Sequence, residues 1–357
     1  VRAMRIAIVA LNAFPAIVPE SGRAVGGLET FAWSLARGLA AHPGTQVQML
    51  VRHTSPPRQS RFEGVDVLAD VESLRTWRRD VSDQVQLVSH FPWFRVNRFR
   101  VDLLWKIPCL AAVRLLGGRR PPLEDRIERM LRPVPPDVVL TLGVGDSSAA
   151  AVTAARRCGI RSVLWIRSNA DLNGAFLKSP DFVDPHGVTS IQAKASYCAD
   201  AILCQTALQQ SRVRDLLGRE SSVIANPVDA DQFPIGDQQP RHRQGVLWIG
   251  RFDRHHKRPG LALEIAKRCP DVSFRMVINR GDPTVEAEIR EQSPPNVEII
   301  DYLPRPEVSR AFREARVFLS TGSPEYEGFP NVLLEAAASG TPIVSWEEFD
   351  GFLSKSG

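Results

Sequence analysis

Short apolar runs alternate along this chain with longer segments in which apolar residues recur at every third or fourth position. Runs of the first kind predict buried strands, and segments of the second kind predict amphipathic helices. Such alternation is typical of α/β domains with parallel sheets. The predicted strands are residues 4–10, 47–51, 137–142, 162–166, 201–205, 245–249, 274–278, 297–300, 317–319 and a short run ending at 344. The predicted helices are residues 29–41, 149–158, 189–199, 207–217, 260–268, 284–291, 306–315 and 330–339.

The chain divides near residue 225. It has 357 residues, 43% of them hydrophobic, which is enough for two buried cores. A polar stretch with prolines and glutamines separates two sets of alternating elements. We therefore predict an N-terminal α/β domain over residues 1–224, a linker over 225–244 and a second α/β domain over 245–357.

Residues 56–136 are the least regular part of the chain, with candidate strands only at 65–68 and 85–88. Within them, residues 91–120 mix aromatic side chains with one acid, Asp102, and seven basic residues: Arg95, Arg98, Arg100, Lys106, Arg114, Arg119 and Arg120. This mixture suits an anionic membrane surface, where rings lie at the headgroup level and cations meet lipid phosphates. It equally suits a helix that covers the sheet with long arginine stems. No nucleic-acid-binding motif accompanies the charge, so we expect no nucleic-acid partner.

Composition indicates the cellular setting. The five cysteines are scattered and form no C-x-x-C pair, which favours a reducing cytoplasm. No window reaches about 18 apolar residues, and a strand begins almost at once, so we expect neither a membrane-spanning helix nor a signal peptide. The net charge of +5 is moderate. The expected location is the cytoplasm, with peripheral attachment to the inner membrane face if residues 91–120 bind lipid.

Two glycine-bearing loops follow predicted strands. Gly26 and Gly27 precede the first helix, where the backbone can approach a bound group closely and the helix start offers free amides. In the second domain Gly250 ends a strand, and a basic loop follows. Its Arg251 and Lys257 place two cations at the carboxyl edge of the sheet, where they are suited to neutralising a diphosphate.

One later segment has two carboxylates around a predicted helix start. Glu327 lies in the preceding loop, Pro330 suits the first helical position, and Gly340 suits the position after the helix. Backbone amides from Asn331 onward, together with the helix dipole, favour an anion at this end. Glu327 and Glu335 would repel a bound phosphate, so we expect them to accept hydrogen bonds from hydroxyl groups beside it.

Two other patterns imitate cofactor sites. Residues 143–148 nearly match a dinucleotide fingerprint, but Ser148 stands where a third glycine is needed for close helix–strand packing, so no nicotinamide site is predicted. The triplet Asp229-Ala230-Asp231 has the form of a metal site. It leads into the linker with no further ligand nearby, so we expect no metal there.

Four segments, in the same order along the chain, resemble the glycosyltransferase family 4 (group 1) enzymes. They are the Gly-Gly-x-Glu loop at 26–29, the linker at 226–233, the Arg/Lys loop at 250–257 and the E-x7-E segment at 327–335. The resemblance implies a GT-B architecture, in which two Rossmann-like α/β domains with parallel sheets face each other across a cleft. Two features depart from the family. Arginine follows Lys257 in place of glycine, and the chain stops soon after residue 344, so we expect a shortened second domain.

The resemblance also implies an activity: retaining transfer of a sugar from a nucleotide-diphosphate sugar to a hydroxyl acceptor, with neither metal nor other cofactor. Arg251, Lys257 and Glu327 are the expected catalytic residues, with the two cations on the diphosphate and Glu327 on sugar hydroxyls. The expected donor-binding residues are Gly26, Gly27, Gly250, Gly328, Phe329, Asn331, Val332 and Glu335, the last of these on the ribose. Arg167 and Asn169, near a position where many relatives carry a sugar-contacting histidine, are candidates for acceptor or sugar binding.

The expected partners are a nucleotide-sugar donor and a glycan, lipid-linked or small-molecule acceptor. No side chain stands out as a nucleophile, and the resemblance implies a front-face substitution in which the leaving phosphate takes the acceptor's proton. Two alternatives stay open at this point. One is a nucleotide-sugar 2-epimerase on the same fold, and the other is a non-catalytic sugar- or membrane-binding module.

Overall fold

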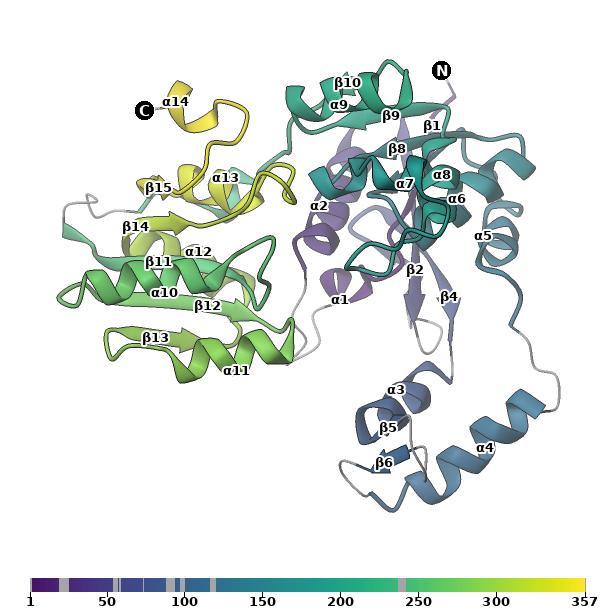
Figure 1. The fold of residues 1–357 in the computed structure, drawn as a ribbon. Helices are drawn as coiled ribbons and strands as arrows, with labels where there is room; N and C mark the ends of the chain where they lie inside the picture. The colour runs from purple at the N-terminus through teal and green to yellow at the C-terminus, as the bar shows by residue number, and fades with distance from the viewer. Residues whose placement is uncertain are drawn as a thin grey trace.

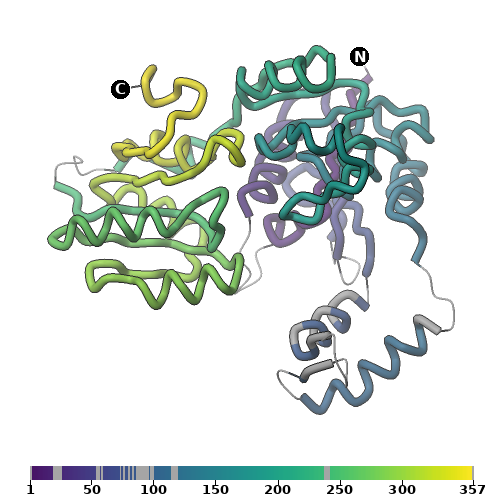
Figure 2. The backbone as a smooth tube through the Cα atoms, viewed as in Figure 1, coloured from purple at the N-terminus to yellow at the C-terminus, as the bar shows by residue number. Residues whose placement is uncertain are grey.

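The computed structural model describes residues 2–18, 26–53, 57, 59–72, 74–87, 94–96, 100–115, 120–236 and 242–356. They form two α/β domains, each built on its own sheet (Figure 1). The N-terminal domain runs from purple to teal and the C-terminal domain from green to yellow (Figure 2). The fold class predicted from the hydrophobic pattern is confirmed.

The N-terminal sheet has eight strands in the described chain, and only β3 runs antiparallel to its neighbour. In spatial order they are β10 (Ser222–Val223), β9 (Ala201–Cys204), β8 (Arg161–Trp165), β7 (Val138–Leu142), β1 (Met4–Val9), β2 (Thr45–His53), β4 (Val65–Val71) and β3 (Arg61–Phe62). The middle strands are buried on both faces, which explains why they read as continuous apolar runs rather than as alternating ones.

Helices cover both faces of this sheet, and β1 shows how the sides are assigned. Ile6 and Ile8 pack against α1 (Phe14–Ile17) and α2 (Gly27–Ala41), whereas Ala7 and Val9 pack against α5 (Leu123–Leu131) and α6 (Asp146–Arg157). Successive side chains of a strand point to opposite faces, so one strand serves two cores. The remaining elements are η1 (Asn169–Leu172), α7 (Ala175–Lys178), α8 (Ser190–Tyr197), α9 (Ala207–Leu217) and η2 (Ala230–Gln232).

The C-terminal sheet is entirely parallel in the described residues. Its order is β13 (Val297–Ile300), β12 (Phe274–Asn279), β11 (Gln244–Arg251), β14 (Ala315–Ser320) and β15 (Ile343–Ser345). The helices are α10 (Pro259–Arg268), α11 (Pro283–Glu291), α12 (Arg305–Glu314), α13 (Asn331–Ala338) and α14 (Phe352–Ser356). Trp248 belongs to the core under α10 and α11, and its neighbour Leu247 to the core under α12 and α13.

The strand order of each sheet reverses beside the domain's first strand. β1 lies between β7 and β2, and β11 lies between β14 and β12. At such a switch point the loops that follow the two neighbouring strands diverge and leave a crevice at the carboxyl edge of the sheet, where ligands bind. In the C-terminal domain these are the loops after β11 and β14. They carry Lys257 and Glu327.

A small unit projects from the N-terminal domain between β4 and α5 (Figure 1). This projecting unit consists of α3 (Arg75–Gln84), β5 (Val85–Leu87), β6 (Phe94–Val96) and α4 (Leu103–Leu115). β5 pairs antiparallel with β6 in a separate two-stranded sheet, so the strand predicted at 85–88 does not join the main sheet. α4 packs on α3 through an edge-to-face contact of Trp77 and Trp105, with ring centroids 4.8 Å apart.

The alternative in which residues 91–120 cover the main sheet is therefore wrong for α4, because this helix lies apart from the sheet. Arg98 and Arg119, counted among the basic residues, lie outside the described part of the chain. Among the helices of the described residues, none combines the length and the apolar character needed to cross a bilayer.

Candidate active site between the two domains

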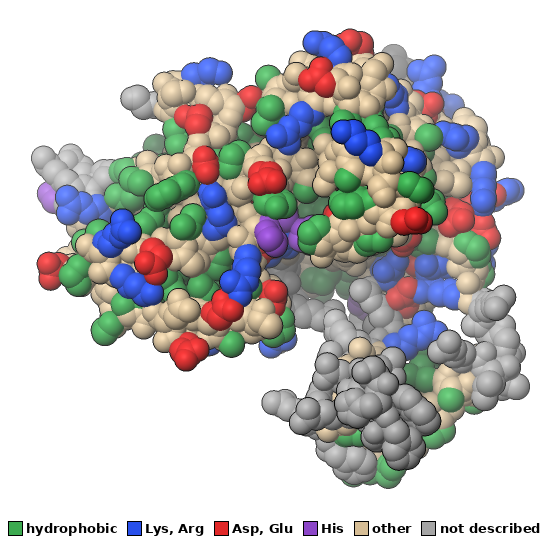
Figure 3. Space-filling view, viewed as in Figure 1, with side chains coloured by type: hydrophobic (Ala, Val, Ile, Leu, Met, Phe, Trp, Pro, Cys, Tyr) green, Lys and Arg blue, Asp and Glu red, His purple; other side chains and the backbone are tan. Residues whose placement is uncertain are grey.

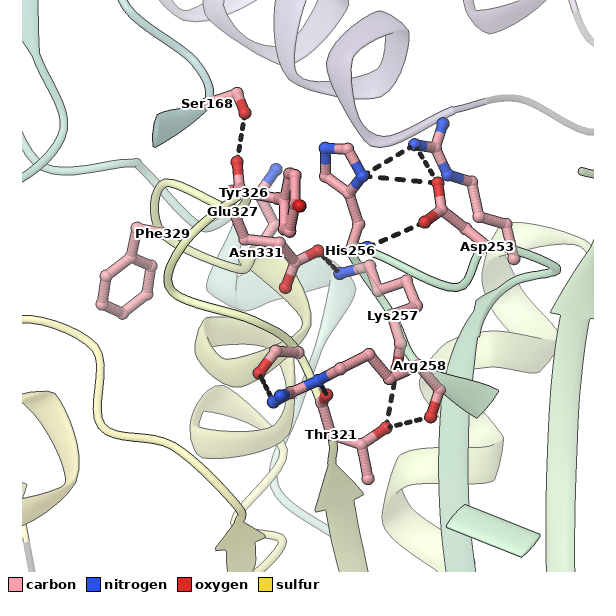
Figure 4. Close-up of polar contacts among 12 residues, drawn as sticks. Ser168, Asp253, His256, Lys257, Arg258, Thr321, Tyr326, Glu327, Phe329 and Asn331 are labelled. Carbon is pink, nitrogen blue, oxygen red and sulfur yellow. Dashed lines mark hydrogen bonds and ion pairs between the residues drawn. The ribbon is translucent and has the colours of Figure 1, made fainter. Parts of the chain in front are cut away.

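Lys257 and Glu327 meet at the C-terminal switch point (Figure 4). The Lys257 ammonium forms an ion pair with Oε1 of Glu327, whose side chain is 9% exposed. The second oxygen of the carboxylate, Oε2, is buried without a hydrogen-bond partner among the described residues. A buried carboxylate oxygen without a donor costs free energy. This oxygen is therefore placed to accept a hydrogen bond from a bound hydroxyl group.

Thr321 fixes the backbone on which Lys257 stands. It directly follows β14, and its hydroxyl Oγ1 donates to the Lys257 carbonyl at 2.7 Å. The same oxygen accepts a hydrogen bond from the indole Nε1 of Trp248 at 2.9 Å. Because Trp248 is 1% exposed, this buried chain of contacts connects the two loops of the switch point to the core of the domain.

Arg258 explains one departure from the family pattern. Its φ of 49° lies in the left-handed region that glycine adopts without cost, which accounts for glycine at this position in the family. The Arg258 guanidinium donates to the carbonyls of Thr321 at 2.7 Å and Gly322 at 2.6 Å, and it pairs with Glu347 at 3.3 Å. These bonds offset the backbone strain and hold the loop after β11 against the loop after β14 (Figure 4).

The loop that carries Glu327 is bound to the N-terminal domain. Ser168 forms a β-bridge with Glu327, and its hydroxyl donates to the Tyr326 carbonyl (Figure 4). The backbone N–H of Asn169 donates to the same carbonyl at 3.0 Å. The Asn169 side chain donates to the Pro324 carbonyl at 2.6 Å. Ser168 and Asn169 therefore hold the two domains together at the site, and Asn169 lies buried under the loop rather than in an open cavity.

Gly328 is required by close packing across the domain boundary. A Cβ at this position would lie 2.0 Å from the Gln205 side-chain amide, 2.6 Å from the Gln209 amide and 3.0 Å from the Arg167 carbonyl. Real Cβ contacts are not this short, so any other residue would displace the two glutamine side chains or the loop. The predicted donor-binding role of Gly328 stays a prediction. The observed contacts by themselves account for glycine.

Asn226, in the linker, joins three parts of the site. Its side-chain Nδ2 donates to the Phe329 carbonyl at 3.2 Å and to Oδ1 of Asn331 at 2.7 Å, while its Oδ1 accepts from Arg167 at 2.8 Å. The Phe329 ring turns away from Lys257 (Figure 4) and packs edge-to-face on Phe352, with centroids 5.2 Å apart. The ring of Phe329 thus belongs to the domain core rather than to the site.

Arg167 is stacked rather than presented to solvent. Its guanidinium lies 3.6 Å from the ring centroid of Phe31 and 5.5 Å from that of Trp165. Burial lowers the pKa of Arg167 to about 9, and the charge of Asp171 partly opposes this. Asp171 accepts hydrogen bonds from the backbone amides of Arg167 and Ser168, at 2.8 and 2.9 Å, and so holds the end of β8 in place.

Arg251 lies on the rim of the crevice. It pairs with Asp253 at 2.7 Å, and Asp253 also pairs with His256 at 3.3 Å. The His256 ring lies 5.0 Å from that of His186 in the N-terminal domain, and Figure 3 shows histidine side chains where the two lobes meet. Burial raises the pKa of Glu29 in α2, and the charge of Arg251 opposes that rise, so Arg251 faces the N-terminal domain.

The start of α13 lies beside a cavity of about 370 Å³ between the domains. Pro330 is the N-cap, one position earlier than predicted, and Asn331 is the first helical residue. Gly340 has a φ of 63° just past the helix, as predicted. The cavity is lined by Gly27, Thr30, Phe31, Ser34, Arg37, Gly38, Pro227, Val228, Asp229, Arg305, Asn331 and Glu335.

Glu335 has a partner that the sequence pattern does not indicate. Its carboxylate is 9% exposed and pairs with Arg305 of α12 at 2.9 Å. The Arg305 guanidinium also lies 4.5 Å from the ring centroid of Phe233. Helix α12 was predicted without its first residue. No local signal marks Arg305, because its role depends on a helix 30 positions away in the sequence.

Of the other glycines, Gly26 is the N-cap of α2, and a Cβ there would lie 2.3 Å from Oε2 of Glu29. The Glu29 carboxylate therefore folds back over the helix start, a contact that the sequence does not reveal. A Cβ at Gly250 would lie 2.3 Å from the Trp248 ring. Packing of that ring is a sufficient reason for glycine at this position.

The structure thus groups the predicted residues into three sets. Lys257 and Glu327 meet directly, and Arg251 is the last residue of the strand that leads into the loop of Lys257. The cavity is lined by Gly27, Asn331 and Glu335, and Gly26 lies next to it as the N-cap of α2. A third set packs inside or between the domains: Arg167, Asn169, Gly250, Gly328, Phe329 and Val332. No described cluster of three or more His, Cys, Asp or Glu side chains is arranged to hold a metal.

Comparison with known proteins agrees with this geometry. Residues 243–353 match the profile of a family described as Glycosyl transferases group 1. Over 148 residues the chain is 32% identical to phosphatidyl-myo-inositol mannosyltransferase of Mycolicibacterium smegmatis, and the alignment covers 39% of this chain and 37% of that relative. The match therefore spans well under half of the curated relative's length.

Solved structures match over a longer range. Sucrose-phosphate synthase from Thermosynechococcus elongatus has a TM-score of 0.62 at 14% identity, covering 98% of this chain and 82% of that one. UDP-GlcNAc 2-epimerase from Neisseria meningitidis has a TM-score of 0.50 at 15% identity, covering 99% and 85%. At these identities the likeness shows the fold, and the predicted GT-B architecture is confirmed. The C-terminal domain, over residues 243–353, matches the family of group 1 glycosyl transferases.

Proposed function

We propose that this chain transfers a sugar from a nucleotide-diphosphate sugar to a hydroxyl acceptor, with retention of configuration and without a metal. The observation that carries this proposal is the Lys257–Glu327 pair, buried where the two domains meet and beside the start of α13. The family of the C-terminal domain supports it. Sugar transferases of this kind need a positive environment for the departing diphosphate and acceptors for sugar hydroxyls. Both lie at this switch point.

The cations act on the leaving group. When the bond between the sugar C1 and the diphosphate oxygen breaks, negative charge develops on that oxygen, and groups already in position stabilise it most. Lys257 supplies a compact charge from inside the crevice, and Arg251 supplies a second one from its rim. The first amides of α13, at Asn331 and Val332, add the positive end of a helix dipole. The backbone amides of Gly26 and Gly27, at the start of α2, assist from the opposite domain.

The carboxylates orient the donor. Oε2 of Glu327 has no donor among the described residues and is assigned to a hydroxyl of the transferred sugar. Glu335 lines the cavity and is assigned to the ribose hydroxyls. Its ion pair with Arg305 holds the carboxylate in this position. A hydroxyl that donates to a buried carboxylate forms a strong hydrogen bond, which favours a sugar over a ligand without that group.

The acceptor reacts without a protein nucleophile. Its oxygen forms the new bond to C1 on the face from which the diphosphate departs, and its proton passes to the leaving phosphate oxygen. We place the acceptor on the N-terminal domain, near the carboxyl edge of the sheet. The name of the mannosyltransferase relative includes a phosphatidyl lipid, which supports a lipid-linked acceptor and makes a nucleotide-linked mannose the first donor to test.

Replacing either cation tests the proposal. Lys257→Ala and Arg251→Ala should each lower kcat by roughly 100-fold, the scale of losing one group that stabilises transition-state charge. Release of nucleoside diphosphate from UDP-, GDP- and ADP-sugars, with candidate acceptors, gives the rate. Arg254→Ala is the matched control, because Arg254 lies on the same loop but pairs with Glu288 of α11. It should turn over donor at the unsubstituted rate.

Other outcomes would replace this function with a rival. An epimerised sugar formed from donor alone would indicate a nucleotide-sugar 2-epimerase. Donor binding in a thermal-shift assay with no turnover of any donor would indicate a binding module, since a ligand at 100 times its Kd stabilises the fold by about 2.7 kcal/mol without chemistry. Unchanged kcat in both alanine variants would overturn the assignment of the cations.

A further inference from the structure

The outer surface of α4 is apolar although it faces water. Val101, Leu104 and Trp105 are 73%, 64% and 48% exposed, and Ile107 is 42% exposed. Leu104 and Ile107 are three positions apart on α4, Trp105 is next to Leu104, and Val101 lies just before the helix start, so the four side chains form one exposed apolar face. Soluble proteins expose single large apolar side chains routinely, but a contiguous apolar face on one helix marks a surface that contacts something else.

The charged side chains beside this apolar face pair with one another. Lys106, 7% exposed, turns inward and donates to Asp102 at 2.6 Å. Arg100 lies 3.4 Å from the same carboxylate and keeps most of its side chain in solvent. The hydrogen bond from Lys106 lowers the pKa of Asp102, which stays ionised. Asp102, the single acid among residues 91–120, is thus neutralised from two sides, and the net charge of that segment is positive.

The projecting unit lies between β4 and α5, where a group of ion pairs joins the two elements. Arg120 follows α4 and pairs with Asp70 at 2.8 Å and with Glu72, both at the end of β4, and Arg126 of α5 pairs with Asp70 as well. Arg120 is therefore held by Asp70 and Glu72 at the end of β4. Although it is one of the seven basic residues counted in the segment, we do not assign it to lipid binding. Since β4 and β8 run parallel within one sheet, the unit leaves the same edge that carries Arg167.

We propose that the projecting unit is a docking surface for an anionic lipid bilayer, with α4 lying in the interface. An exposed apolar helix face in a segment whose net charge is positive matches the two layers that such a surface presents, acyl chains below and phosphates above. Its position at the ligand edge of the N-terminal sheet brings that edge to the bilayer. Where the proposed function also holds, the acceptor is a lipid whose hydroxyl lies at the headgroup level.

Vesicle flotation of the whole chain tests this surface. We expect binding to phosphatidylcholine vesicles that contain phosphatidylglycerol, weaker binding to phosphatidylcholine alone, and a loss of binding as salt rises. The double variant Leu104→Glu/Ile107→Glu should bind at least about 10-fold more weakly, because both side chains lose their transfer into the acyl layer. Ile191→Glu, at a 77% exposed position on α8, is the matched control and should bind as the unsubstituted chain does.

The readouts separate this proposal from the transfer activity. Flotation uses neither donor nor acceptor, so vesicle binding without turnover supports the surface and leaves the transfer assay to decide the function. Thermal melting of both variants confirms that they fold, as expected for substitutions at exposed positions. No flotation with either vesicle, or equal flotation of the double variant and the unsubstituted chain, would remove the proposal.

Discussion

Three basic residues at the end of β11 and in the loop after it have distinct surroundings, which assign them distinct tasks. Lys257 is mostly enclosed and paired with Glu327, while Arg251 is 45% exposed and paired with Asp253. Arg258 donates instead to backbone carbonyls of the opposite loop. Arginine suits that task because its planar fork holds several donors in a fixed geometry, which lysine lacks. The first two cations are available to a ligand, whereas the third shapes the loop.

Arg258 carries a prediction about backbone strain. Arg258→Ala removes the hydrogen bonds but keeps a side chain in the left-handed region, whereas Arg258→Gly removes the bonds and the strain together. The glycine variant should therefore be more stable than the alanine variant by about 1 kcal/mol, although both should be less stable than the unsubstituted chain. Urea unfolding measures the order. An alanine variant as stable as the glycine variant would show that the left-handed turn stores no strain.

At the scale of the element, Asp253 organises the loop after β11. Its carboxylate accepts from the backbone amides of His255 and His256, both at 2.8 Å, and it pairs with Arg251. Burial acts to raise the pKa of Asp253, but the bonds to His256 and the charge of Arg251 lower it well below its ordinary value of 3.8. The loop thus keeps its shape through a carboxylate that stays ionised in mild acid.

This depressed pKa has a consequence for acid stability. The ionised form is favoured in the folded chain, so its contribution is complete above pH 4 and is lost as the pH falls through the folded-state value. Asp253→Asn should lower the free energy of unfolding by about 1–3 kcal/mol at pH 7, and the difference should shrink at pH 3. Urea unfolding at both pH values checks this. Asp271→Asn, at an exposed position of the same domain, should behave like the unsubstituted chain, and a pH-independent difference for Asp253→Asn would contradict the assignment.

For the whole molecule, the loop after β14 joins the two domains at the site. Its residues 324–329 bond to Ser168, Asn169 and Asn226, which belong to the N-terminal domain and the linker. Glu327 therefore reaches its position only when both domains are in contact. Because interfaces within a chain are small and separable, the site is expected to depend on closure of the two domains.

Gly328 tests that dependence. Gly328→Ala places a methyl group against Gln205 and Gln209 with the Arg167 backbone behind them, so the loop must withdraw, and stability should fall by about 1–3 kcal/mol. Turnover should fall with it, because Glu327 moves with the loop. Gly260→Ala is the control: apart from its chain neighbours and its own helix backbone, no atom of the described residues lies within 4 Å of a Cβ built there, and alanine should raise helix stability by about 0.5–1 kcal/mol. Full activity of Gly328→Ala, measured as diphosphate release, would mean that this domain contact is dispensable.

Much of the architecture was readable from the chain because local physics determines it. A strand buried on both faces must be apolar, a helix needs its periodic stripe, and a left-handed helix end needs a residue such as Gly340. Order along the chain then places the segments 250–257 and 327–335 at the carboxyl edges of parallel strands. The candidate residues Lys257 and Glu327 could therefore be named from the sequence, and the structure brings them together.

Only the tertiary structure decided which of these residues face a cavity and which pack between domains. The partner of Glu335 is Arg305, Gly328 is confined by Gln205, and Arg167 stacks on Phe31. Each of these contacts joins residues far apart in the sequence, so no local pattern encodes it. The same holds for α4, whose periodicity is compatible with covering a sheet or leaving it. Pairing of distant elements is settled by packing of the whole chain, and that packing directed α4 outward.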